Sequence, residues 1–126
     1  MNPVDELYRR LARIAKEEFL DIVASLELRG DRLRIHIVDG SFLDVWFSRT
    51  LPGKYAFHWE RRHIDGTVYR WDNAAHRSIA GISTYPHHFH EASQRNVKPY
   101  RPKETWEDTL REILNYIRNK ISAGYG

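Results

Sequence analysis

Four of the seven histidines of this chain lie between positions 76 and 90, directly after an aspartate and an asparagine. The residues of this stretch that could take part in chemistry are Asp72, Asn73, His76, His87, His88 and His90. Imidazole titrates near neutral pH, so two histidines can serve as general base and general acid, and a neutral ring can bind a metal ion. In an extended segment His88 and His90 would point to one side and His87 to the other. The stretch therefore predicts a site of proton transfer.

Two arginines close to this stretch would add a binding site for an anion. If the turn at 65–66 closes a hairpin with a two-residue loop, Arg61 lies directly opposite Arg70. Two arginines in that position repel each other unless an anion lies near them, and guanidinium groups form paired hydrogen bonds with phosphate. We therefore expect Arg61 and Arg70 to bind a phosphate, Asn73 to donate to its oxygens, and Asp72 to orient one imidazole.

Each of these features also has a simpler structural interpretation. A histidine-rich loop can be a solvated turn, and Asp72-Asn73 alone is typical of a turn that ends a strand. The two arginines can pair with Glu60, Asp72 or water. It is the combination of histidines, carboxylate, amide and arginines in one region that favours a functional site.

The remaining histidines and the tryptophans are expected to serve the fold. His36 and His58 lie inside predicted strands, where packing or a cross-strand contact is the expected role. Trp106 is expected to anchor the last helix. Three further tryptophans are expected in the core, and not as a platform on which bases stack: Trp46, Trp59 and Trp71.

The elements that position these residues follow from the spacing of apolar side chains. Helical spacing predicts a helix over 3–17 with Asn2 as its cap, and Thr105 with Asp108 predicts the start of a closing helix. Alternating apolar residues predict strands at 20–29, 32–37, 42–48, 54–63 and 67–71, whereas 72–103 shows no periodicity. The expected fold is α+β: a single antiparallel sheet, a meander of about five strands, with the N- and C-terminal helices packed on one face of a single domain, 1–126.

The composition narrows the functional classes. Lysine and arginine number 20 against 17 acidic residues, a net charge of +3 that fits a polyanionic partner. The absence of cysteine excludes disulfides, thiolate metal sites and a cysteine nucleophile. No apolar run is long enough to span a membrane and no signal-peptide pattern opens the chain, so we expect a cytoplasmic protein without membrane contact. Glycine-rich phosphate loops, GxSxG and HExxH are missing.

Two segments resemble the TumE-type family of toxins from toxin–antitoxin systems. The first follows the pattern R-[FW]-D-N-A-x-H-H through Arg70, Asp72, Asn73, Ala74 and His76. The second follows T-x-P-H-H-x-H through Thr84, Pro86, His87, His88 and His90. Ala75 stands where proline is common in the family and Arg77 where a second histidine is common. The resemblance implies a small cytoplasmic toxin encoded beside a helix-turn-helix antitoxin.

Residues and resemblance together predict a toxin-like enzyme that acts on RNA or another phosphate-containing substrate. Arg70 and Arg61 would hold the phosphate. Two of the four clustered histidines would deprotonate a 2′-OH and protonate the leaving oxygen, as in a metal-independent ribonuclease that needs no cofactor.

Two alternatives come from other functional classes. The first is a non-catalytic module that binds nucleic acid or an antitoxin, supported by the basic residues Arg9, Arg10 and Arg13. The second is a structural site for a divalent metal with His76, His88 and His90 as ligands. A homodimer is expected only because symmetric dimers are common.

Overall fold

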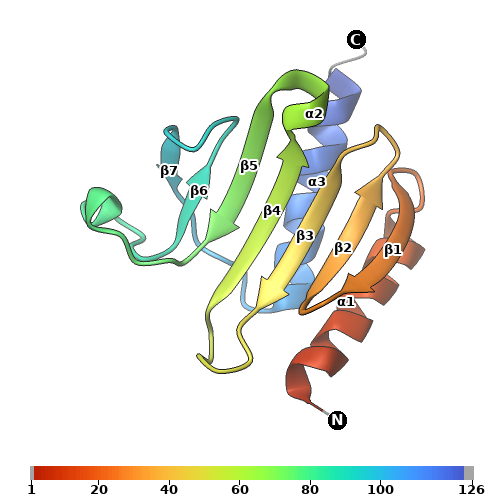
Figure 1. Ribbon diagram of the computed structural model, residues 1–126, viewed down its shortest axis with the longest axis horizontal. Helices are drawn as coiled ribbons and strands as arrows, with labels where there is room; N and C mark the ends of the chain where they lie inside the picture. Colours follow the sequence, from red (N-terminus) through yellow and green to blue (C-terminus); the bar gives the residue numbers. More distant parts are fainter. Residues whose placement is uncertain (1, 124–126) are drawn as a thin grey trace.

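A seven-stranded antiparallel sheet and two long helices make up most of the computed structural model, which describes residues 2–123 (Figure 1). Helices α1 (Pro3–Glu18) and α3 (Trp106–Ala123) pack together behind the sheet. The strands follow one another across the sheet in chain order: β1 (Val23–Arg29), β2 (Arg32–Ile37), β3 (Phe42–Phe47), β4 (Tyr55–Arg61), β5 (Thr67–Asp72), β6 (His88–His90) and β7 (Val97–Pro99). The predicted α+β class, with both terminal helices on one face of one antiparallel sheet, is confirmed.

The two helices begin where their capping residues predict. The Asn2 Oδ1 atom accepts a hydrogen bond from the Val4 backbone N–H at 2.8 Å, and Thr105 Oγ1 accepts one from Asp108 N–H at 3.1 Å. Each helix turns an apolar stripe toward the sheet. The fully buried apolar side chains of α3 are Leu110, Ile113, Leu114 and Ile117.

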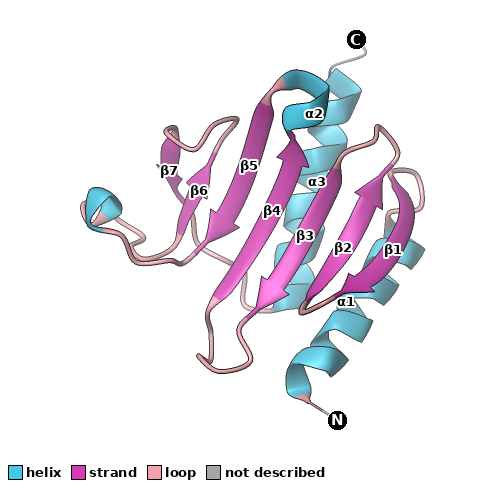
Figure 2. Ribbon diagram, viewed as in Figure 1, coloured by secondary structure: helices cyan, strands magenta, loops and turns pink. Residues whose placement is uncertain are grey.

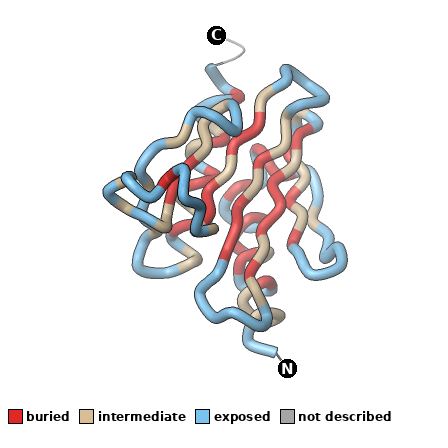
Figure 3. The backbone as a smooth tube through the Cα atoms, turned by 60° about the vertical axis from the view of Figure 1, so that its left-hand side comes forward, coloured by how far each residue is buried: buried red, intermediate tan, exposed pale blue. Residues whose placement is uncertain are grey.

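Alternation along the strands separates an apolar face from a polar one. Ile35, Val45 and Phe57 are fully buried against the helices, and along β2 buried positions alternate with less buried ones (Figure 3). Both long helices lie on this apolar side, as Figure 2 shows. We call the other side the open face, because neither α1 nor α3 covers it.

The sheet has two strands more than expected, because the segment 72–103 is not wholly irregular. It contains a short 3-10 helix, η1 (Arg77–Ile79), and then strands β6 and β7. Each of these strands has three residues, too few for alternation to be recognised in the sequence.

The predicted hairpin between β4 and β5 is wrong in its register. Arg62 to Asp65 form one helical turn, α2 (Arg62–Asp65), which Gly66 closes with a positive φ of 80°. The longer connection pairs Arg61 with Thr67 and His58 with Arg70. Arg61 therefore does not lie opposite Arg70.

The first predicted strand also differs from the structure. β1 starts at Val23 rather than at Leu20, with an irregularity in its pairing between Val23 and Ser25. It forms one edge of the sheet, and the expected apolar side chains Leu20 and Leu28 are exposed. At this edge of the sheet, the alternation of apolar residues in the sequence does not indicate which side chains are buried.

Candidate active site

Strands β5 and β6 bring the two sequence motifs together on the open face. Arg70 is the cross-strand partner of His90, and Asp72 is the partner of His88. The intervening residues Trp71 and Phe89 point to the helices instead, where their rings stack with centroids 4.5 Å apart. Two motifs that are separate in sequence thus form one cluster of four side chains.

Asp72 is the acceptor at the centre of this cluster. Its carboxylate is buried and accepts hydrogen bonds from Arg70 Nε at 2.8 Å and from the backbone N–H of Ala74 at 2.9 Å. The Nε2 atom of His88 lies 3.0 Å from Asp72 Oδ1. The contact with Ala74 is the turn interaction that was one expectation for Asp72. The contact with His88 fits the other expectation, in which Asp72 orients an imidazole.

His88 is enclosed, with 1% of its surface exposed. Its Nδ1 lies 2.8 Å from the carbonyl oxygen of Pro86, and its Nε2 faces Asp72. Both neighbours are hydrogen-bond acceptors, and they hold the ring between them. A side chain so enclosed supports its neighbours and does not reach a substrate.

His90 is the histidine of the cluster that reaches the surface, with 14% of its side chain exposed. Its Nδ1 lies 2.9 Å from the carbonyl oxygen of Gln94, which places the proton of the neutral ring on Nδ1. The Nε2 atom faces the cluster, 3.8 Å from Asp72 Oδ2. Burial lowers the pKa of His90 below the ordinary 6.5, so Nε2 is available as a proton acceptor at neutral pH.

The polar cluster continues onto β4 through His58. Its Nδ1 accepts a hydrogen bond from Arg70 Nη1 at 3.2 Å, and its Nε2–H donates to Glu60 Oε1 at 3.1 Å. Burial lowers the pKa of His58, and hydrogen bonds from Arg62 hold the pKa of Glu60 at about 2. Arg70 is thereby held from both sides, by Asp72 and by His58, while 35% of its side chain stays exposed.

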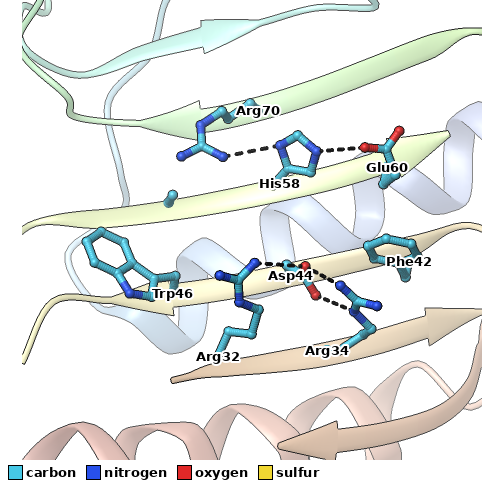
Figure 4. Close-up of a pocket in the computed structure, with 9 residues that line it drawn as sticks. Arg32, Arg34, Phe42, Asp44, Trp46, His58, Glu60 and Arg70 are labelled. Carbon is cyan, nitrogen blue, oxygen red and sulfur yellow. Dashed lines mark hydrogen bonds and ion pairs between the residues drawn. The ribbon is translucent and has the colours of Figure 1, made fainter. Parts of the chain in front are cut away.

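The cluster opens at Arg70 into a groove of about 470 Å³ that crosses β2 to β5 (Figure 4). Arg70, His58 and Glu60 form one side of the groove. The other side consists of Arg32, Asp44 and Arg34. In that row the buried Asp44 accepts hydrogen bonds from Arg34 Nε at 2.8 Å and Nη2 at 2.9 Å.

Two aromatic residues stand at the ends of the second row, Phe42 and Trp46 (Figure 4). The expectation that Trp46 lies in the core is wrong, because its position on β3 turns it to the open face. Trp59 and Trp71 are in the core as predicted. His58 makes the cross-strand contact expected of it, yet its membership of the groove was missed, because only the true β4–β5 register places it beside Arg70.

Two of the predicted catalytic histidines lie outside the cluster. His76 is exposed in the loop before η1. His87 points away from Asp72, as predicted from the alternation of side chains along an extended segment. Its Nδ1 lies 3.1 Å from the Tyr55 hydroxyl. The expected gathering of four imidazoles therefore reduces to His88 and His90.

Of the three residues predicted to bind a phosphate, Arg70 lies in the cluster, whereas Arg61 and Asn73 are engaged elsewhere. Arg61 is paired with Asp39 and Asp65, and its guanidinium lies over the ring of Trp59. Asn73 accepts a hydrogen bond from the Tyr55 N–H at 3.0 Å through its side-chain oxygen. Its side-chain NH₂ donates to the carbonyl oxygen of Gly53 at 2.8 Å, so the amide is engaged in holding the turn.

A metal site would use a different set of ligands from the one predicted. Ligand atoms of Asp72, His88 and His90 lie within 4.8 Å of one another, whereas His76 is not among them. Nitrogen and oxygen donors of this kind suit zinc and similar divalent ions. A metal ion there would displace the hydrogen bond between His88 and Asp72 and would lie beside the Arg70 guanidinium.

Comparison with known proteins agrees with the sequence motifs. A family model described as Toxin TumE matches residues 5–121, a region that contains both motifs and nearly all of α1 and α3. No curated protein and no solved structure matches the chain. Within residues 2–123, none of the helices has the length and apolar character needed to cross a membrane. The extent of the family match shows that the chain belongs to the TumE toxin family.

Proposed function

We propose that this toxin cleaves RNA, with Arg70 binding the phosphate and His90 accepting the proton of the attacking 2′-OH. The observation that carries the proposal is the cross-strand pairing of Arg70 with His90 on the open face. The pair combines a partly exposed guanidinium with a neutral imidazole whose Nε2 is free to take a proton.

The chemistry follows from these two side chains. His90 Nε2 takes the proton of the 2′-OH, the resulting oxygen attacks phosphorus, and the bond to the 5′-oxygen breaks to leave a cyclic phosphate. Arg70 stabilises the extra negative charge that develops on the phosphoryl oxygens. The leaving oxygen takes its proton from water, because His88, the other histidine of the cluster, is enclosed.

Asp72, His88 and His58 act as positioning residues in this proposal. Asp72 and His58 fix the orientation of the Arg70 guanidinium through hydrogen bonds of 2.8 and 3.2 Å. His88 in turn holds Asp72. All of these groups come from one chain, so the proposed reaction does not require a homodimer.

A toxin implies an antitoxin that neutralises it, and the proposal takes this antitoxin to be a helix-turn-helix protein. The family match supports an antitoxin as partner. A cytoplasmic location, where the toxin would meet both RNA and antitoxin, belongs to the same proposal.

The reaction is tested by replacing His90 and, as a matched control, the exposed His76. We expect His90→Ala to lower the rate of RNA cleavage by about 10²- to 10⁴-fold, the contribution of a general base. The His76→Ala variant should cleave like the wild type, because its ring lies outside the cluster. The rate is measured on total RNA with purified protein, after circular dichroism has shown that both variants are folded. Equal cleavage by wild type and His90→Ala would contradict the proposed role of His90.

A further inference from the structure

Trp46 differs from the other tryptophans of the chain in its surroundings. Trp59 and Trp71 are buried, and Trp106 packs against Phe47 and Tyr55. Trp46 is only partly buried, and within residues 2–123 it takes part in no aromatic or cation–π contact. Its Nε1–H donates to Asp31 Oδ2 at 3.0 Å, which holds the indole in place. The open face therefore carries an oriented indole that no other ring covers.

A hollow lies beside this indole. On β4 the cross-strand partner of Trp46 is Ala56, whose methyl group is the smallest side chain along the groove. The groove of about 470 Å³ has the size of sites that bind small organic molecules. Phe42 at the far end offers less free surface, because the Arg34 guanidinium lies 3.9 Å from its ring centre.

The charges around the hollow suit an anionic chain. Arg32 lies next to Trp46 in Figure 4, has 45% of its side chain exposed and reaches Asp44 at 3.5 Å. Arg34 is held more tightly by Asp44, so Arg32 is the more available cation on that side. Arg70 stands on the opposite side, and the hollow thus has an available guanidinium on each side.

We infer that this groove binds one unpaired RNA base, stacked on Trp46, with the neighbouring phosphates at Arg32 and Arg70. The inference rests on the proposed function in that both use Arg70, and it adds the requirement that the substrate is single-stranded. In a duplex the faces of each base are covered by its neighbours, so no base can enter the hollow. A sheet face with an exposed ring and basic side chains is a common surface for single-stranded RNA.

The inference is tested by binding rather than by cleavage. The His90→Ala variant serves as background so that the RNA stays intact, and fluorescence anisotropy gives the dissociation constant of a labelled single-stranded hexaribonucleotide. Adding Trp46→Ala should weaken binding by about ten-fold, the size expected for one base–aromatic stack. Adding Trp46→Phe should restore most of the affinity, because phenylalanine keeps a ring at the site.

The contribution of positive charge to RNA binding is tested by replacing one arginine inside the groove and one outside it. Adding Arg32→Ala should weaken binding and reduce its dependence on salt, because one phosphate contact is lost. Arg13→Ala removes the same charge from an exposed position on α1, behind the sheet, and should leave the affinity unchanged. A duplex of the same sequence should bind more weakly and should not respond to Trp46→Ala.

The outcomes separate this inference from the proposed reaction. Unchanged affinity on Trp46→Ala, with cleavage still lost in His90→Ala, would overturn the base site and leave the reaction standing. Binding that depends on Trp46, without cleavage by the wild type, would support the base site and contradict the reaction. A loss of affinity on Arg13→Ala instead of Arg32→Ala would move the RNA to the helical side and overturn the inference.

Discussion

The two clustered histidines differ in the hydrogen bonds that surround their rings. His88 faces an acceptor at each nitrogen, a carbonyl oxygen and a carboxylate, and it is enclosed. His90 faces one carbonyl oxygen, and its second nitrogen remains available. This difference is the basis for proposing His90, and not His88, as the group that transfers a proton, although the two residues have the same chemistry in isolation.

The lowered pKa of His90 leads to a prediction on the pH dependence of cleavage. Burial outweighs the Gln94 carbonyl oxygen and the Asp72 carboxylate, both of which raise this pKa, so the ring stays neutral below the ordinary 6.5. A general base acts in its neutral form, so kcat/KM should decrease on acidification with a midpoint below pH 6.5. The profile is measured on a short single-stranded RNA. A midpoint above 6.5, or a flat profile, would contradict His90 as the base.

At the scale of single residues, the sequence predicts the four clustered side chains but not the residues of the groove beside them. Asp72, His88 and His90 follow from their place around an extended segment, because side chains two positions apart share one face of a strand. His58, Glu60 and Trp46 could not be predicted as members of the site. Their position beside Arg70 depends on the register between β4 and β5, which α2 sets, and a single turn of helix is hard to recognise in sequence.

The short strand β6 is the element on which the site depends most. It supplies both clustered histidines, yet it is only three residues long and pairs with β5 on one side and the equally short β7 on the other. Its attachment to the core comes from Phe89, which stacks on Trp71 and contacts Tyr116 edge-on. The position of the histidines is therefore set by an apolar residue on the opposite face.

Replacing Phe89 tests this dependence without touching the proposed reaction groups. Phe89→Ala removes a buried ring and should lower the free energy of unfolding by about 3 kcal/mol, with Phe89→Leu in between. Cleavage should fall even where the protein is still folded, because His88 and His90 lose their position opposite β5. Urea denaturation gives the stability, and hydrogen exchange shows whether β6 opens before the central strands. Wild-type cleavage in a destabilised Phe89→Ala protein would contradict this account.

The long elements, in contrast, are predicted well from the sequence. α1 and α3 have apolar residues at helical spacing and side chains that cap their first turns, so local and long-range preferences agree. β2 and β3 show alternation over six residues each and match the predicted ranges within one residue. β6 and β7 lack this length, and their pairing is fixed by the strands beside them.

Across the whole molecule, stability and proposed chemistry occupy opposite faces of one sheet. The helices are tied together behind the sheet by the apolar core and by hydrogen bonds from Arg111 to Glu18. The open face carries ionisable side chains that are half-buried without a helix over them. Such groups are shielded from water by neighbouring side chains alone. The stability of the fold should therefore depend on pH.

This dependence has a definite direction. Burial lowers the pKa values of His58, His87 and His90 below the ordinary 6.5, which the unfolded chain retains. Below pH 6.5 the unfolded chain therefore binds more protons than the folded one, and the free energy of unfolding must decrease as the pH falls. Glu60 acts in a lower window, because its pKa of about 2 lies below the ordinary 4.5 and its contribution is lost between these values.

We therefore expect the midpoint of thermal unfolding to decrease between about pH 7 and pH 5, near the range in which histidine titrates. His58→Gln should make this decrease shallower, because one buried titrating ring is gone, even if the variant is less stable at pH 7. The midpoint is followed by circular dichroism across the pH range. A midpoint that stays constant or rises on acidification would contradict the lowered pKa values of these three histidines, and the neutral His90 on which the proposed reaction depends would lose its basis.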